Sequence, residues 1–241
     1  MINLFRKYRR GMLGKGNISQ YLLYAIGEIA LVVIGILIAL QINNWNEERK
    51  AKRLEIELVE EVSTGLKSDL ADVELNLNTL ERRIVNQSKL IDWLENDQPF
   101  HDSLSFYLKN MYSYSFFSVN EGPYETLKQY GMRRIKNDSL RNQIANLYDI
   151  VYPVYIDILG VYIEDANKLK SFSPRHFEEM TFSNKVMKPL NAEKLKADNE
   201  YTYYVKTLRN TNQSYLKYRT QQTKDEIEKT IRMIENQLAE R

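Results

Sequence analysis

The feature that most constrains this chain is an apolar run from Tyr21 to Ile42, in which only Glu28 and Gln41 are strongly polar. As a helix, the run would be roughly 33 Å long, which is enough to cross a hydrocarbon core of about 30 Å. A cleaved signal peptide is the competing interpretation, but it would have a shorter apolar region that ends in small residues at a cleavage site. No A-x-A pattern follows this run. Residues 21–42 therefore predict one uncleaved transmembrane helix.

The segments on either side of the run predict its orientation. Residues 1–20 contain no acid and carry five cations, namely Arg6, Lys7, Arg9, Arg10 and Lys15. Such a segment can lie on an anionic membrane surface and is typical of the cytoplasmic side. Cations also follow the run, but a long C-terminal domain is translocated largely regardless of its charge. We therefore expect a cytoplasmic N-terminus, an aromatic interface anchor at Trp45, and residues 43–241 outside the cytoplasm.

Glu28 is the unexpected residue within the run. It shares one helix face with Ala25, Val32, Gly35 and Ala39, at alternating spacings of four and three residues. Small residues let a second helix approach closely, and a polar residue among them can form a hydrogen bond across the contact. An ionised acid near the bilayer centre costs roughly 3 kcal/mol. The pattern predicts a helix–helix contact, with a second copy or another membrane protein. The alternative is a protonated or snorkelling acid without a specific partner.

The remainder of the chain predicts an all-α fold, because Gly and Pro are scarce and apolar residues recur at helical spacing. We expect the transmembrane helix to continue into a stalk, as one helix from about Ser19 to Asp97 that is on the order of 115 Å long. Further helices are expected at 103–112, from Gly122 to Gly131, from a cap at Asn137 or Asp138 with a kink at Pro153, after Pro174, and at 200–238. The long amphipathic helices should pack as an antiparallel, coiled-coil-like bundle. "YSYSF" is the only short strand candidate.

The stripes of apolar and aromatic residues on these helices predict which side chains form the core. In the first helix the stripe comprises Leu54, Leu58, Val62, Leu66, Leu70, Val73, Leu77, Leu80, Ile84, Gln87, Ile91 and Leu94. In the last it comprises Tyr201, Tyr204, Leu208, Thr211, Tyr215, Tyr218 and Gln222, and continues from Ile227. Tyrosines are frequent on the last two long helices, where Tyr148, Tyr152, Tyr155 and Tyr162 also share a face. Such tyrosines are predicted to be core residues, and the alternative is a tyrosine-lined pocket for a small molecule.

The sequence contains no recognisable catalytic or metal-binding pattern. Net charge is +2, and the part beyond the apolar run is near neutral, which argues against a nucleic-acid partner. There is no cysteine, and the two histidines, His101 and His176, lie in polar connectors without ligand spacing. "GMLGKGN" lacks the spacer and the Ser/Thr of a phosphate loop. We therefore predict no catalytic residues, no cofactor and no metal.

Two blocks of sequence resemble a known family. The block "YLLYAIGEIALVVIGILIALQINNWNEERK" (residues 21–50) is similar to the N-terminus of an uncharacterised bacterial family of single-span membrane proteins, a domain of unknown function. The later block "YETLKQYGMRRIKNDSLRNQIANLY" (residues 124–148) also resembles that family, although "YGMRR" departs from its smaller or more apolar residues. The resemblance implies an inner-membrane protein with a helical domain outside the cytoplasm, and it implies no activity.

These observations lead to two hypotheses about function. The first is a membrane-anchored helical scaffold, adaptor or accessory subunit without catalysis, which acts through association with a second copy or another membrane protein. The second is a ligand-sensing bundle that binds a small molecule in its tyrosine-lined interior and signals through a membrane partner. A short N-terminal tail without an output domain disfavours the second hypothesis.

Overall fold

The computed structural model describes residues 18–181 and 185–240, and in these ranges the chain is helical with no strand. It divides into two compact units, Met1–Glu55 and Ile56–Arg241. The first helix, α2 (Ile18–Glu95), runs through this boundary without a break, which confirms the prediction of one helix from about Ser19 to Asp97. No proline occurs in it, so nothing removes a backbone donor along its length. The predicted all-α fold, with helices packed against the first one, is also confirmed.

The second unit contains the C-terminal half of α2 and a set of further elements. These are α3 (Leu104–Met111), α4 (Gly122–Tyr130), η1 (Met132–Arg134), α5 (Asp138–Asn146), η2 (Leu147–Val151), α6 (Tyr152–Ser171), α7 (Ser173–His176), α8 (Ala192–Lys196), α9 (Asn199–Thr211), η3 (Asn212–Leu216) and α10 (Lys217–Ala239). Two predicted boundaries are confirmed. Gly131 ends α4 with a φ of 93°, a conformation that favours glycine, and Asn137 caps α5 by accepting from Leu140 N at 3.1 Å.

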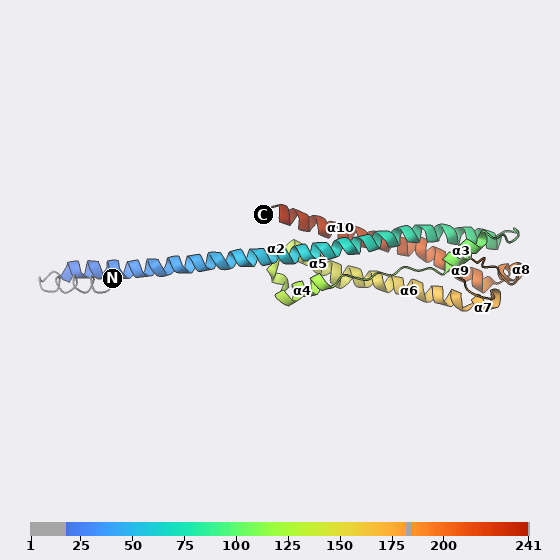
Figure 1. Ribbon diagram of the computed structural model, residues 1–241, viewed down its shortest axis with the longest axis horizontal. Helices are drawn as coiled ribbons and strands as arrows, with labels where there is room; N and C mark the ends of the chain where they lie inside the picture. The colour runs from blue at the N-terminus through green and yellow to red at the C-terminus, as the bar shows by residue number, and fades with distance from the viewer. Residues whose placement is uncertain (1–17, 182–184, 241) are drawn as a thin grey trace. The chain divides into compact units, whose positions relative to one another are not determined.

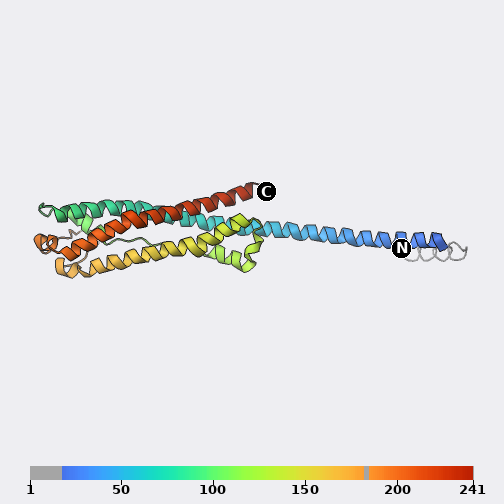
Figure 2. The same ribbon diagram turned by 180° about the vertical axis from the view of Figure 1, so that it is seen from behind.

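The long helices of the second unit do not all run in the same direction. Four ion pairs join α2 to α9 and α10, namely Glu95 with Lys206, Glu81 with Lys217, Glu74 with Lys224 and Lys67 with Glu235. Along this series the residue numbers fall in α2 and rise in α9 and α10. These helices are therefore antiparallel. In contrast, Asp69 bonds Tyr152 and Gln87 bonds Tyr162, so α2 and α6 run parallel. Figures 1 and 2 show α3, α7 and α8 together at one end of this unit, and α4 at the other.

An extended segment, Ser113–Glu121, makes the parallel arrangement possible, and we refer to it as the strap. It carries the chain back along the bundle from α3 to α4 (Figure 1), so that α6 starts again at the same end as the bundle part of α2. Its side chains alternate between more buried and more exposed, as in a strand, with Ser115 inside and Tyr114 and Phe116 outside. The "YSYSF" segment is thus extended, but it lies against helices and not in a sheet.

Two π-helical turns interrupt the later helices, and the second changes which residues are buried. In place of a kink at Pro153, the irregular turn is η2, and Pro153 occupies the first turn of α6. In the last helix, η3 adds one residue to a turn, so the buried row runs Leu208, Asn212, Leu216 and Thr220. Tyr215 and Tyr218, predicted to be core residues, are exposed, as is Gln222. The step of five residues from Gln222 to Ile227 in the predicted stripe was the sequence sign of this extra residue.

The buried face of α2 is also rotated around the helix axis relative to the predicted stripe. Leu70, Leu77 and Ile84 are only half-buried, whereas the residues just before them, Asp69, Asn76 and Arg83, are buried. Gly65 lies on the same face, and a Cβ there would approach Pro123 Cγ to 3.2 Å. The absence of a side chain at Gly65 thus lets α4 approach α2 closely. Further along this face of α2, the buried residues Asp69, Asn76 and Arg83 are polar and not aliphatic.

Candidate functional site

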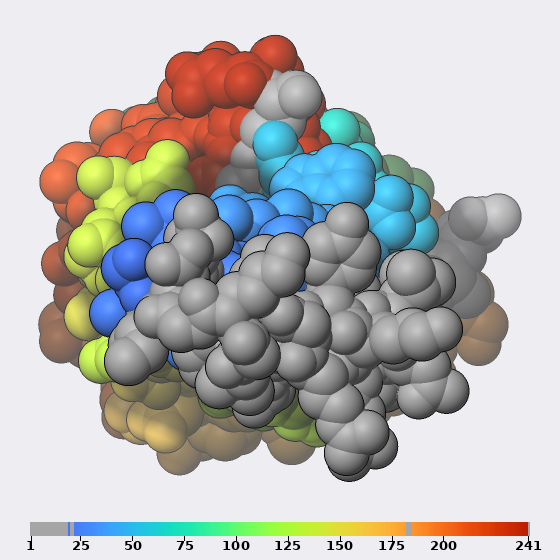
Figure 3. Space-filling model, turned by 90° about the vertical axis from the view of Figure 1, so that its left-hand side faces the viewer, coloured from blue at the N-terminus to red at the C-terminus, as the bar shows by residue number. Residues whose placement is uncertain are grey.

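The first unit presents an apolar helix surface. In the most apolar stretch of α2, no residue is buried. The first turns of this helix are visible in blue in Figure 3, and aliphatic residues from Leu22 to Ile42 are extensively exposed. A second stretch, Asp138–His176, also meets the length and composition of a span, but part of it is buried in the bundle. A long exposed apolar helix near the N-terminus is compatible with a membrane anchor.

The predicted contact face lies on this surface. Glu28, Val32, Gly35 and Ala39 are exposed, and Ala25 is half-exposed. Apart from the adjacent backbone of the helix itself, no described atom lies within 4 Å of the position that a Cβ would take at Gly35. Among the described residues, none therefore blocks the close approach of another helix to this face.

The predicted span has an aromatic residue, Trp45, on one side and the N-terminal cations on the other. Trp45 is exposed, and the guanidinium carbon of Arg49 lies 5.7 Å from the centre of its ring. An exposed tryptophan beside a cation suits a membrane interface. The predicted membrane-surface cations Arg6, Lys7, Arg9, Arg10 and Lys15 lie outside the described residues.

In the second unit, buried polar residues of α2 hold the strap. Asp69, Asn76 and Arg83 are spaced by seven residues, so they lie on one helix face. Oδ1 of Asp69 accepts from Asn120 N at 2.9 Å, Nδ2 of Asn76 donates to Phe116 O at 2.7 Å, and Nη2 of Arg83 donates to Ser115 Oγ at 3.0 Å. These bonds replace the backbone partners that an extended segment would have in a sheet.

Tyrosines of α6 contact the same polar residues from the other side. The hydroxyl of Tyr152 donates to Asp69 Oδ2 at 2.9 Å, and that of Tyr155 accepts from Asn76 at 3.4 Å. Burial raises the pKa of Tyr152 well above its ordinary range, and the neighbouring charge of Asp69 raises it further. Burial also raises the pKa of Asp69, although its two hydrogen bonds oppose that shift. The second unit is therefore closed by polar contacts as well as by apolar packing.

A separate polar cluster, formed by Gln87, Tyr162 and Asn212, lies further along the bundle. The hydroxyl of Tyr162 accepts from Gln87 Nε2 and from Asn212 Nδ2, both at 3.2 Å, and Asn212 also donates to Gln87 Oε1 at 2.8 Å. All three residues are buried. Asn212 reaches this position because η3 turns it inward. The polar break at Gln87 in the predicted stripe was the one sequence sign of this cluster.

The buried tyrosines are core residues. Tyr148, Tyr152, Tyr155, Tyr162 and Tyr201 are all buried, as predicted. The rings of Tyr124 and Tyr148 stack with centres 4.4 Å apart, and Tyr148 contacts Tyr152 edge to face. Because these rings touch one another and their hydroxyls are bonded, a ligand in their place would have to displace those contacts.

His176 is buried, although its sequence context is polar. Its Nε2 lies 2.7 Å from Oδ2 of Asp198, which caps α9 by accepting from Tyr201 N at 3.0 Å. Burial alone would raise the pKa of Asp198, but the bonds from Tyr201 and His176 hold it below its ordinary value. His101 is exposed, and its Nδ1 contacts the hydroxyl of Ser103. In the described ranges, no group of three His, Cys, Asp or Glu side chains could hold a metal ion.

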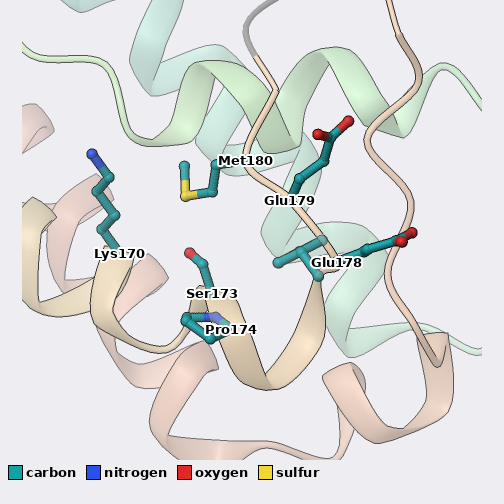
Figure 4. A pocket seen from close by; sticks show the side chains of 7 residues that line it. Lys170, Ser173, Pro174, Glu178, Glu179 and Met180 are labelled. Atoms are coloured by element: carbon teal, nitrogen blue, oxygen red, sulfur yellow. The ribbon is translucent and has the colours of Figure 1, made fainter.

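Two hollows lie on the surface of the described part of the second unit. A pocket of about 250 Å³ beside α7 has Lys170 and Glu179 on opposite sides, as Figure 4 shows, and its Ser173 already donates to the hydroxyl of Tyr112 at 3.1 Å. An open cleft of about 580 Å³ between α2 and α4 is lined by Glu57, Glu60 and Glu61. In the first hollow, the hydrogen bond described for the Ser173 side chain goes to Tyr112 and not to the lining carboxylates Glu178 and Glu179.

Comparison with known proteins identifies a family. No curated protein and no solved structure matches this chain. A family model, described as a family of unknown function (DUF6090), matches residues 28–208. The match includes Glu28, the strap and the polar residues Asp69, Asn76 and Arg83. Since the match covers most of the chain, the protein belongs to this family of unknown function.

Proposed function

We propose that this protein is a membrane-anchored helical scaffold or accessory subunit that acts by association and has no catalytic activity. Residues 21–42 would cross the inner membrane with the N-terminus in the cytoplasm, and residues 43–241 would form the extracytoplasmic domain. The observation that carries the proposal is the exposed apolar surface of α2 between Leu22 and Ile42. An exposed surface of this size requires lipid or another protein to cover it.

The proposed contact face comprises Ala25, Glu28, Val32, Gly35 and Ala39. Small side chains bring two helix backbones close together, and Glu28 would then form a hydrogen bond across the contact. Such a bond would offset the cost of placing the acid in hydrocarbon. The partner is a second copy of this chain or another membrane protein with a complementary face.

The alternative function is a ligand-sensing bundle. It receives less support because the tyrosines on which it depends are packed together and hydrogen-bonded. A sensor would also have to transmit its signal through a partner. The two functions differ in what they require of the bundle, since only the sensor needs an interior that opens to a ligand.

Extraction of the full chain in mild detergent, followed by native mass spectrometry, tests the proposal. We expect the protein in the membrane fraction as an oligomer or as a complex with a second membrane protein. Glu28→Gln should weaken that assembly, and Gly35→Leu should weaken it by preventing close approach. Matched controls are Glu48→Gln, an exposed acid beyond the run, and Gly27→Leu, a glycine on a different face. A soluble protein, or an assembly that all four variants leave intact, would contradict the proposal.

Orientation is tested separately by protease treatment of intact spheroplasts. If the C-terminal domain is extracytoplasmic, protease added outside should degrade it while leaving a short N-terminal fragment protected. Protection of the whole chain until the membrane is permeabilised would reverse the proposed orientation without affecting the proposed anchor.

A further inference from the structure

Arg83 is a buried cation without a counter-charge among the described residues. Its side chain is 2% exposed, its Nη2 donates to Ser115 Oγ at 3.0 Å, and its Cζ lies 5.0 Å from the centre of the Tyr162 ring. Its Nε and Nη1 are buried and have no hydrogen-bond partner in the part of the chain that the structure describes. The ion pairs between α2 and the last helices use Lys67, Lys206, Lys217 and Lys224, and none of them includes Arg83.

A guanidinium in this position stays charged, because arginine does not lose its proton under any condition in which the protein is folded. Burial of a charge is costly unless an opposite charge or a full set of hydrogen bonds compensates for it. Ser115 and the face of Tyr162 supply only part of that compensation. Two buried nitrogens, Nε and Nη1, which carry three N–H donors, remain to be satisfied.

Arg83 differs in this respect from the other polar residues of the same helix face. Both oxygens of Asp69 accept hydrogen bonds, and Asn76 donates to the strap. Gln87 donates to Tyr162 and accepts from Asn212. On this face of α2 the incomplete set of partners is thus found at Arg83, while Oδ1 of Asn212 in the neighbouring cluster is a buried acceptor that also has no partner among the described residues.

The surroundings define the chemistry of the missing partner. The free groups at this position are guanidinium N–H donors, and the hydroxyl of Ser115 can turn its hydrogen toward the same partner. The Tyr162 hydroxyl is already engaged with Gln87 and Asn212, so Tyr162 contributes its ring alone. Because Arg83, Ser115 and Tyr162 are all buried, only a small ion could be accommodated without opening the bundle.

We propose that Arg83 and Ser115 bind a small monovalent anion of the size of chloride, enclosed between α2, the strap and α6. The anion neutralises the buried guanidinium and fastens the strap to α2 near the start of the strap, at Ser115. The site is a property of the folded second unit and is independent of the proposed anchor and of its partner.

Thermal unfolding of the full chain in a nonionic detergent tests the site, with chloride exchanged for gluconate at constant ionic strength. Gluconate is too large to enter a closed site. An ion that binds only the folded state raises the unfolding midpoint with the logarithm of its concentration. We expect this rise in chloride, its absence in gluconate, and its loss in Arg83→Met.

The matched control is Arg82→Met, which removes the neighbouring arginine, an exposed one, from the same helix. Both variants lower the net charge by one, so a general effect of salt on the surface would change equally in both. Arg82→Met should keep the chloride response of the wild type. Ser115→Ala should keep the response but shift it several-fold to higher chloride concentration, because one of the two groups remains.

Chloride NMR on the wild type provides a direct measurement that needs no variant to fold. We expect the protein to broaden the chloride resonance, and added bromide to reverse the broadening by competition. Absence of protein-dependent broadening, or equal chloride responses of Arg83→Met and Arg82→Met, would overturn the proposal. In that case, protein dipoles or enclosed water would be what satisfies the guanidinium.

Discussion

The hydroxyl of Tyr152 on α6 donates a hydrogen bond of 2.9 Å to Oδ2 of Asp69 on α2, while Oδ1 of the same carboxylate accepts from Asn120 N in the strap at 2.9 Å. One buried acid therefore joins three segments that are far apart in the sequence. The helix face on which it lies continues with Asn76 and Arg83, which contact the strap in the same way. This row of polar contacts explains how an extended segment is retained in a helical bundle.

The buried acid predicts a pH dependence of stability. Burial raises the folded-state pKa of Asp69 above the ordinary value of 3.8, so the folded protein holds this proton more tightly than the unfolded chain. Its contribution to stability is complete below that ordinary value and is lost as the pH rises through the raised pKa. Urea unfolding at several pH values should therefore show that wild type loses stability relative to Asp69→Asn as the pH increases. Glu60→Gln, an exposed acid of α2, serves as the control, and a pH-independent difference would contradict the prediction.

The strap predicts a specific cost for the loss of Asn76. Asn76→Ala leaves the carbonyl of Phe116 without its 2.7 Å partner in a partly buried position, which should lower the free energy of unfolding by about 1–3 kcal/mol. Asn78→Ala, at an exposed position of the same helix, should change it by less than about 0.5 kcal/mol. Chymotrypsin should also cleave the strap after its aromatic residues faster in the first variant. Equal cleavage rates would show that Asn76 does not hold the strap.

The register of α2 against α10 is open to a charge-swap test. Glu81 and Lys217 form an exposed ion pair at 2.8 Å, which is worth about 0.2–1 kcal/mol. Glu81→Lys alone should destabilise the protein by a similar amount, and the double variant with Lys217→Glu should recover most of that loss. The combination of Glu81→Lys with Lys206→Glu should recover nothing, since Lys206 pairs with Glu95. Equal recovery in both double variants would disprove the register.

The buried tyrosines predict that part of the phenolate absorbance appears only when the protein unfolds at alkaline pH. Burial raises the pKa of Tyr148, Tyr152 and Tyr201. Their phenolate absorbance should therefore rise in a step that coincides with unfolding. The stabilising effect of a raised phenol pKa is complete below the ordinary value of 10.0 and is lost as the pH rises. Tyr152→Phe should reduce the step that coincides with unfolding, and Tyr218→Phe, at an exposed position, serves as the control. Phenolate absorbance that is complete before the protein unfolds would contradict the buried assignment.

Much of the fold could be predicted from local patterns. The long first helix, the caps at Gly131 and Asn137, and the buried tyrosines of α6 follow from periodicity and from the conformational preferences of single residues. The predicted core stripe of the last helix was wrong at Tyr215 and Tyr218, because one extra residue in the turn η3 rotates the later side chains. In the sequence, the extra residue appears only as one irregular spacing between apolar residues. The position of the irregular turn is then easily assigned wrongly.

The polar residues of the bundle are the part that the sequence did not reveal. Asp69, Asn76 and Arg83 appear in the sequence as ordinary polar positions beside an apolar stripe, because burial of a polar side chain becomes favourable only when a partner is present. Those partners come from the strap and from α6, and only the tertiary structure brings them to α2. The same reason applies to His176 and Asp198, which lie 22 residues apart and form a contact that no spacing indicates.

The sequence by itself determined that the chain is helical and that its N-terminal helix is apolar enough to cross a membrane, since both properties depend on local composition and on the period of a single helix. The tertiary structure decided which faces are buried, that α6 runs parallel to α2, and that an arginine lies inside the bundle with two nitrogens that have no partner in the described part of the chain. These features depend on contacts between distant segments, and the free energy of such contacts is not encoded in any one segment.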